Sequence, residues 1–368
     1  MRSRLVGFIL IIQSILFLTH AFLYETWVFF WVPATSGISA LRVAFFLLSI
    51  SFVVASVLSF RFYNPFARLF YTLSAAWLGI GSFCVWSSCS CWVLYLILRI
   101  GGIEANRRDL ALFFLPLAVL ASAYGIANAA CTRVRQIAVT LPNLPASWRG
   151  RTAALVTDMH LGPVRGVRFS RRIAALVTRL NPGVVFISGD LYDGTGADLK
   201  RLAEPWSRVS PPFGVYFVTG NHEEFTDRSR YLDAVGGAGI RVLNNEKIVL
   251  DGLQLIGVHD RESADSAGFR AILERANLDR NCASVLLVHT PHRLAIPETE
   301  GISLQLSGHT HGGQFWPYTW ITSRIYGKFV YGLQRFGNLQ VYTSYGAGTW
   351  GPPMRVGTRP EIVLIRLE

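Results

Sequence analysis

The stretch VVFISGDLYD (residues 184–193) decides the fold, because a short apolar run ends abruptly in glycine and aspartate. A run of this length that is rich in β-branched residues is typical of a buried strand. The pattern recurs at AALVT (153–157), VYFVT (215–219), SVLLV (284–288) and ISLQL (302–306). Polar residues follow each run, so the sequence predicts five strands with polar side chains at their carboxyl ends.

Helical segments separate some of these strands. FSRRIAALVTRLN (169–181) has helical spacing and stops at Asn181-Pro182-Gly183, and a second helix is expected over 266–278. Short apolar strands that alternate with helices predict a largely buried sheet with helices outside it. In open α/β sheets, ligands bind beyond the carboxyl ends of the strands. The polar residues of the five runs are therefore expected to lie near a ligand.

These polar residues are of metal-ligating types. They are Asp158 and His160, Asp190 and Asp193, Asn221 and His222, His289, and the pair His309 and His311 in SGHTHGGQ (307–314). Taken singly, each has an ordinary explanation, because Asp and Asn are frequent in turns and a lone histidine is usually a hydrogen-bonded core residue. All of them occur in one domain and in the same position relative to a strand. The conjunction predicts a metal site.

The first part of the chain differs in composition from the rest. Residues 1–140 contain only three acidic residues, and four segments there are long and apolar enough to cross a bilayer, at about 5–30, 38–60, 68–98 and 109–130. The first begins like a signal peptide, but its apolar stretch is long and three further spans follow, so a retained helix is expected. The third is long for one span and contains Gly79 and Gly81, which leaves a tilt, a kink or a re-entrant turn open.

We therefore expect three parts: a transmembrane region at 1–132, a linker with an edge strand at 133–152, and a polar domain at 153–368. The linker is predicted because TRVRQIAVTLPNLPASWRG alternates and contains two prolines. Eight arginines lie at the N-terminus, in the 61–68 loop and just after residue 130, against four on the other side of the predicted spans. The positive-inside rule then places both termini and the polar domain in the cytoplasm.

The formal charge of +12 does not indicate nucleic-acid binding. Ten basic and three acidic residues fall in 1–140, mostly beside predicted spans, where basic residues contact anionic lipid headgroups. The polar domain has no run of basic residues with interleaved aromatics, so no nucleic-acid partner is expected and a nuclease is disfavoured. The five cysteines form no CxxC pair, which argues against a disulfide framework or a cysteine zinc site.

The order Asp-x-His, Gly-Asp-x-x-Asp, Gly-Asn-His-Glu, His and Gly-His-x-His resembles that of the calcineurin-like metallophosphoesterases. The resemblance runs from about Ala153 to the C-terminus, including SYGAGTWGPPMRVGTRPEI (344–362). Within that family, the chain looks like the membrane-attached bacterial branch that includes UDP-2,3-diacylglucosamine hydrolases. The resemblance implies an α/β domain with two packed β-sheets flanked by helices, an αββα sandwich, after the four N-terminal helices.

The resemblance also implies roles for the polar residues. Asp158, His160 and His311 would hold one divalent ion, Asn221, His289 and His309 would hold a second, and Asp190 would bridge both. His222, oriented by Asp193, would be the general acid or would stabilise the leaving oxygen after a metal-bridging hydroxide attacks phosphorus. Nitrogen and oxygen ligands without cysteine favour Mn, Fe, Zn or Co. Arg165 and His292 are weaker candidates for the substrate end, and the His259-Asp260 turn is expected to be structural.

The expected function is that of a membrane-tethered two-metal phosphoesterase that hydrolyses a phosphodiester or pyrophosphate bond. A lipid-linked substrate is favoured, because four spans exceed what an anchor needs, and the expected location is a bacterial inner membrane. A phosphomonoesterase or phosphodiesterase acting on soluble nucleotides would carry the same motifs. A membrane sensor or transporter with a phosphoesterase-like regulatory domain is a further alternative, although the spans contain almost no charged residues. The aromatic residues of 313–335 either meet acyl chains or the bilayer, or pack under a loop. The sequence leaves the oligomeric state open.

Overall fold

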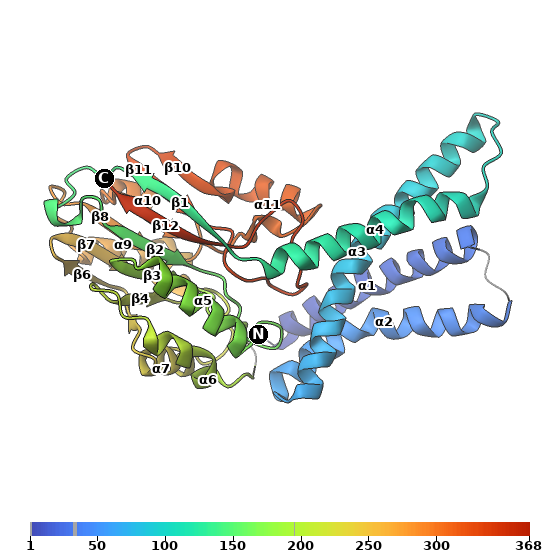
Figure 1. Ribbon diagram of the computed structural model, residues 1–368, viewed down its shortest axis with the longest axis horizontal. Coiled ribbons are helices and arrows are strands. Elements are labelled where there is room, and N and C mark those ends of the chain that lie inside the picture. The colour runs from blue at the N-terminus through green and yellow to red at the C-terminus, as the bar shows by residue number, and fades with distance from the viewer. Residues whose placement is uncertain (1, 32–34, 195) are drawn as a thin grey trace. The chain divides into compact units, whose positions relative to one another are not determined.

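The computed structural model describes residues 2–31, 35–194 and 196–368. It contains two compact units, one formed by the chain up to residue 127 with 351–354, and one formed by residues 128–350 with 355–368. The first unit is helical and the second is an α/β unit (Figure 1). Each unit is described below by itself.

The four predicted apolar helices are present. They are α1 (Arg2–Trp31), α2 (Thr35–Arg61), α3 (Pro65–Ile100) and α4 (Arg107–Ala130), and each is long and apolar enough to cross a membrane. The third is one continuous helix of 36 residues, which runs through Gly79 and Gly81 without a re-entrant turn. At 1.5 Å per residue it is about 54 Å long, well beyond the hydrocarbon thickness of a bilayer.

Polar side chains inside the helical unit form isolated pairs. The Trp77 indole N–H donates to Nε2 of His20 at 2.9 Å, and the Trp92 indole N–H donates to the Thr26 hydroxyl at 2.9 Å. The Ser87 hydroxyl donates to the Phe114 carbonyl at 2.9 Å, which links α3 to α4. Hydrogen bonds of this kind join helices where no water competes.

Two six-stranded sheets form the framework of the α/β unit. The first sheet has the order β1 (Arg133–Val139), β12 (Glu361–Leu367), β2 (Thr152–Val156), β3 (Val184–Ser188), β4 (Val215–Val218), β5 (Arg241–Val242). The second has the order β10 (Gly332–Phe336), β11 (Leu339–Thr343), β9 (Leu304–Ser307), β8 (Ser284–Leu287), β7 (Leu253–Gly257), β6 (Glu246–Leu250). Strands β2 to β5 are mutually parallel, as are β7, β8, β9 and β11, while β12 is antiparallel to β2.

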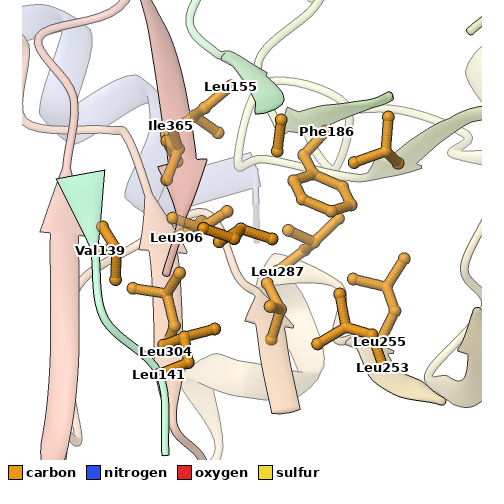
Figure 2. Close-up of a cluster of buried hydrophobic side chains, with 14 of the residues drawn as sticks. Val139, Leu141, Leu155, Phe186, Leu253, Leu255, Leu287, Leu304, Leu306 and Ile365 are labelled. Carbon is orange, nitrogen blue, oxygen red and sulfur yellow. The ribbon is translucent and has the colours of Figure 1, made fainter. Parts of the chain in front are cut away.

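The main core lies between the two sheets. Leu155, Phe186 and Ile365 point from the first sheet toward Leu287 and Leu306 of the second (Figure 2). Side chains alternate along a strand, so the residues between these positions point to the outer faces. This pattern explains why β2 and β3 are apolar throughout: both of their faces are covered.

Helices cover the outer faces. On the second sheet, Phe269 and Ile272 of α9 (Ser266–Arg275) pack with Ile296 of α10 (Ala295–Thr299) against Ile256 and Leu286. The helix α5 (Val167–Leu180) is amphipathic, and its apolar face is buried. The remaining helices are α6 (Leu199–Ala203), α7 (Ser229–Gly237), α8 (Asp260–Ala264) and α11 (Tyr318–Tyr326), with short 3₁₀ turns between elements. The predicted αββα sandwich is confirmed.

The five strands predicted from the apolar runs are β2, β3, β4, β8 and β9, each within two residues of its expected start and end. The expected helices at 169–181 and 266–278 are α5 and α9. Strands β5, β6, β10, β11 and β12 were not predicted, because they are very short or carry alternating or charged residues. Strand β12 lies between β1 and β2, and β1 is at the edge of the first sheet.

Candidate metal centre

All seven predicted metal ligands follow the carboxyl ends of strands. Asp158 and His160 follow β2, Asp190 follows β3, Asn221 follows β4, His289 follows β8, and His309 and His311 follow β9. Five of them are buried, while Asn221 and His309 are partly exposed. The first three strands belong to one sheet and the other two to its partner, so both sheets contribute ligands to one site.

Asp158, His160 and His311 form one compact group. The Nε2 atoms of His160 and His311 are 2.9 Å apart, and Nε2 of His311 is 3.4 Å from Oδ1 of Asp158. The backbone N–H of His309 donates to the Asp158 carboxylate at 3.0 Å and holds it in place. Two imidazole nitrogens and one carboxylate oxygen therefore converge, in the grouping that the family resemblance implies for one ion.

Asp190 lies between this group and the next. Its Oδ2 is 3.7 Å from Nε2 of His160 and 3.1 Å from Nε2 of His289. Asp158 also reaches His289, with Oδ1 at 3.9 Å from Nε2. One carboxylate oxygen thus faces ligands of both predicted ions, which is the position that a bridging ligand requires.

The second predicted group is completed by Asn221 and His309. Oδ1 of Asn221 is 2.9 Å from Nδ1 of His309. The His309 ring packs edge-on against the His289 ring, with centroids 5.1 Å apart. The structure therefore brings all seven residues together, and their assignment to particular ions stays a prediction.

The backbone around the site is strained. Asp158, His160, Asp190, His309 and His311 all have positive φ, between 48° and 71°. Left-handed conformations cost a non-glycine residue roughly 1–3 kcal/mol each, and they persist where the surrounding fold and a function require them. Five of the seven predicted ligands carry this cost.

The donor set fits divalent ions. Nδ1–H of His289 donates to the Ser188 carbonyl at 2.8 Å, so Nε2 presents its lone pair to the carboxylates in the neutral ring. That Nε2 is buried and has no hydrogen-bond partner. A backbone carbonyl behind an imidazole is the usual arrangement for a metal-ligating histidine, because it fixes the tautomer. A divalent ion would satisfy this nitrogen and both carboxylates at once.

The charges of the site are coupled. Burial lowers the pKa of His289, but the carboxylates of Asp190 and Asp158 outweigh it and hold that pKa well above the usual value. Burial raises the pKa of Asp190, yet His289 and His222 outweigh it and lower the pKa well below normal. Burial lowers the pKa of His309 to about 4. In the metal-free site, a proton on His289 therefore offsets carboxylate charge.

The predicted catalytic pair lies beside these ligands. Nδ1 of His222 donates to the backbone carbonyl of Asp193 at 3.2 Å, and the Asp193 carboxylate is 3.8 Å away. The same carboxylate is 3.5 Å from Nδ1 of His160. Asp193 thus orients His222 mainly through its main chain, and its side chain lies between two imidazoles. Burial raises the pKa of Asp193 to about 7.

Glu223 joins the loops that carry the ligands. Its buried carboxylate accepts backbone N–H groups from Asp190 at 3.0 Å, Tyr192 at 2.9 Å and Gly220 at 2.8 Å. These bonds tie the loop after β3 to the loop after β4. Glu223 belongs to the Gly-Asn-His-Glu motif, so its position was visible in the sequence, but its three bonds were not.

Arg355 was also missed. This fully buried side chain donates through Nη2 to Nδ1 of His311 at 2.9 Å and to the carbonyls of Tyr345 and Gly348. Its Nη1 donates to the His311 carbonyl at 3.1 Å. Burial lowers the pKa of Arg355 to about 10. The guanidinium therefore fixes both the ring and the backbone of one predicted ligand.

The weaker candidates have structural contacts. The Arg165 guanidinium donates to the Ala129 carbonyl at 3.0 Å, and Nε2 of His292 bonds the Ser263 carbonyl at 2.9 Å. Nδ1 of His259 accepts the Thr219 N–H at 3.1 Å. Of the aromatic residues in 313–335, Phe315 is buried, while Trp316, Tyr318 and Trp320 are exposed.

The chain is similar in sequence to known proteins. Residues 152–313 match the family model described as calcineurin-like phosphoesterase. A transmembrane protein with metallophosphoesterase domain from Danio rerio is 35% identical over 283 residues, which cover 72% of this chain and 64% of that protein. A Campylobacter jejuni protein named as an uncharacterized metallophosphoesterase is 32% identical over 239 residues, covering 64% and 63%.

A third relative, an Aquifex aeolicus protein also named as an uncharacterized metallophosphoesterase, is 29% identical over 259 residues, covering 68% of this chain and 98% of that protein. The chain spans less than two thirds of the length of the first two relatives. The match to the family model, residues 152–313, covers the strands and loops that carry all seven predicted ligands. The chain therefore carries a calcineurin-like metallophosphoesterase domain.

Proposed function

We propose that this protein is a membrane-tethered, two-metal phosphoesterase that hydrolyses a phosphodiester or pyrophosphate bond. The observation that carries the proposal is the convergence of seven predicted nitrogen and oxygen ligands from two sheets, among them Asp190, whose Oδ2 faces His160 and His289. Nitrogen and oxygen donors suit Mn, Fe, Zn or Co.

Divalent ions bound there would supply positive charge for phosphate oxygens and an activated water. Asp158 and Asp190 offset part of that charge, while the N–H of His309 holds Asp158 in place. The Asp193 carbonyl holds Nδ1–H of His222, which leaves Nε2 to donate a proton to the leaving oxygen when the ring is charged. Burial lowers the pKa of His222, and Asp190 and Asp193 offset only part of that effect in favour of the charged ring.

A lipid-linked substrate is supported by the four apolar helices of the same chain, which keep the domain at a bilayer. The arginine distribution supports a cytoplasmic domain, and the resemblance to membrane-attached bacterial enzymes supports a bacterial inner membrane. The sensor or transporter alternative receives less support, because the buried His20 has hydrogen-bond partners at both ring nitrogens.

The test is hydrolysis by the detergent-purified full chain, stripped of metal and reloaded with Mn²⁺. The substrates are bis-p-nitrophenyl phosphate, p-nitrophenyl phosphate and a UDP-linked diacylglucosamine, and the control variant is Asn221→Ala. The expected result is metal-dependent turnover of the wild type, with the lipid-linked substrate preferred. Turnover of soluble esters alone would favour the soluble-nucleotide alternative. Binding of metal without any turnover would overturn the proposal.

A further inference from the structure

Helix α11 carries the largest concentration of exposed apolar side chains in the α/β unit. Ten large apolar side chains are exposed among the described residues 128–368, and five of them fall within 316–325: Trp316, Tyr318, Trp320, Ile321 and Ile325. None of the nine residues of α11 is buried. An apolar concentration of this kind on a soluble surface marks an interaction site.

The exposed residues share one face. Trp320, Ile321, Arg324 and Ile325 are spaced i, i+1, i+4 and i+5, so they lie together on one side of the helix. Ile325 is 68% exposed and Trp320 is 55% exposed. We call these four residues, with Lys328 just beyond the helix, the α11 surface.

The charged side chains in this stretch of the sequence have one sign. Residues 301–360 contain no aspartate or glutamate, whereas the α11 surface contains Arg324 and Lys328. The Arg324 guanidinium lies over the Trp320 ring, 5.4 Å from its centroid. Indole rings and basic side chains with long apolar stems are the residues that settle at a lipid headgroup boundary.

The helix is fixed on its inner side. A Cβ at Gly313 would approach the Tyr318 carbonyl oxygen to 2.2 Å, so the start of α11 lies directly on the loop that carries His309 and His311. At the other end, the Tyr326 ring packs against the His309 ring, with centroids 6.0 Å apart. The apolar face is therefore presented outward by a helix that is held in place.

We propose that the α11 surface docks onto an anionic lipid bilayer. The four apolar helices of the chain keep a bilayer within reach of the α/β unit. The basic residues, with no acidic residue nearby in the sequence, complement phosphate headgroups, and each such residue near an anionic surface favours docking about fivefold. A short helix with an apolar face and basic flanks lies in the plane of the interface.

Docking of the α11 surface would also bring lipid substrates close to the candidate metal centre. Because α11 contacts the His309 loop, lipid held at this surface would lie next to the candidate metal centre. This consequence rests on the proposed phosphoesterase function, whereas docking itself does not.

The experiment places an NBD fluorophore on Ile325→Cys in the full chain, with Cys131 and Cys282 replaced by serine. The matched control carries the probe on Val249→Cys, because Val249 is 60% exposed and lies on β6. Signal from the remaining cysteines is subtracted with the background variant. The proteins are placed in nanodiscs of phosphatidylcholine with or without phosphatidylglycerol, and quenching is measured with doxyl-labelled lipid and with iodide.

Docking predicts that doxyl lipid quenches the probe at position 325 and not at 249, and that iodide does the reverse. Omitting phosphatidylglycerol, or introducing Arg324→Glu and Lys328→Glu together, should lower the docked fraction by at least about fivefold. Equal iodide access at both positions overturns docking. Shielding from both quenchers also overturns it, and indicates a protein contact.

Turnover of bis-p-nitrophenyl phosphate by the same samples separates the two proposals. Quenching by doxyl lipid without turnover would contradict the phosphoesterase function and leave docking supported. Turnover without quenching by doxyl lipid would contradict docking and leave the phosphoesterase function supported.

Discussion

The helical unit and the α/β unit treat a buried histidine in opposite ways. In the helical unit, Nδ1 of His20 bonds the Leu16 carbonyl at 2.7 Å and Nε2 accepts the Trp77 indole N–H at 2.9 Å. In the α/β unit, Nδ1 of His289 bonds the Ser188 carbonyl, but Nε2 faces two carboxylates without a hydrogen bond. Both ring nitrogens of His20 are bonded to neutral groups, whereas Nε2 of His289 faces carboxylates and can take either a proton or a metal ion.

The same contrast holds across the described residues. Every buried side-chain nitrogen or oxygen that lacks a hydrogen-bond partner lies at residue 128 or later in the described chain. Every non-glycine residue described with positive φ lies at 143 or later. Unsatisfied groups and left-handed backbone are costly, and part of this cost falls on the candidate site, where five predicted ligands have positive φ and Nε2 of His289 lacks a hydrogen-bond partner.

Asp190→Ala tests this contrast with the largest expected effect. The carboxylate faces ligands of both predicted ions, so its loss should lower both metal content and turnover. Loss of an outer partner of a metal ligand already costs 10–100-fold, so we expect a loss of more than about 100-fold in turnover. Metal content by mass spectrometry and hydrolysis of bis-p-nitrophenyl phosphate are the measurements.

The control for this prediction is Asp233→Ala, an exposed carboxylate on α7. It should bind two ions per chain and keep wild-type turnover. Full metal content in Asp190→Ala would contradict the bridging role.

Arg355→Lys sharpens the contrast within the site. Lysine keeps the charge but lacks the planar fork, so it cannot bond the His311 ring and the carbonyls of Tyr345 and Gly348 together. We expect metal affinity to fall by about 10–100-fold, as for other partners of metal ligands. Competition with a fluorescent chelator measures the affinity. Arg359→Lys, an exposed change in the same tail, is the control, and equal affinities would show that Arg355 only packs.

Arg355 also shows where prediction from sequence ends. The gathering of polar residues at one place was predictable because each follows an apolar strand, and strand ends of parallel neighbours meet at one edge. The choice of seven of them as ligands came from the family resemblance and stays a prediction. The bond from Arg355 to His311 spans 44 positions and has no local pattern. Strand β12 was missed because its apolar run, 362–365, is only four residues long and is flanked by Glu361 and Arg366, although most of the strand is buried. The sequence left the aromatic residues of 313–335 either exposed or packed, because composition does not show which side of α11 meets the loop at Gly313.

The protonation of His289 predicts how metal binding depends on pH. Asp190 and Asp158 raise its pKa well above 6.5, so the metal-free site holds a proton on His289 at neutral pH. An incoming ion must displace that proton, and apparent affinity should therefore rise about tenfold per pH unit until the raised pKa is passed. Calorimetric titration in two buffers of different ionisation enthalpy counts the released protons. If no proton is released on metal binding at pH 7, His289 is already neutral before the metal ion binds.

The smallest expected effect belongs to the helical unit. His20→Phe, Trp77→Phe and the double variant form a cycle around the bond between α1 and α3. Side-chain hydrogen bonds between membrane helices contribute about 0.6 kcal/mol on average, so each single variant should unfold at slightly lower temperature in detergent. Metal content and turnover should stay at wild-type values, because both ring nitrogens of His20 are occupied by partners within its own unit. If His20→Phe instead lowers turnover tenfold while the helices stay folded, this histidine acts in the function, and the contrast between the two units fails at its clearest point.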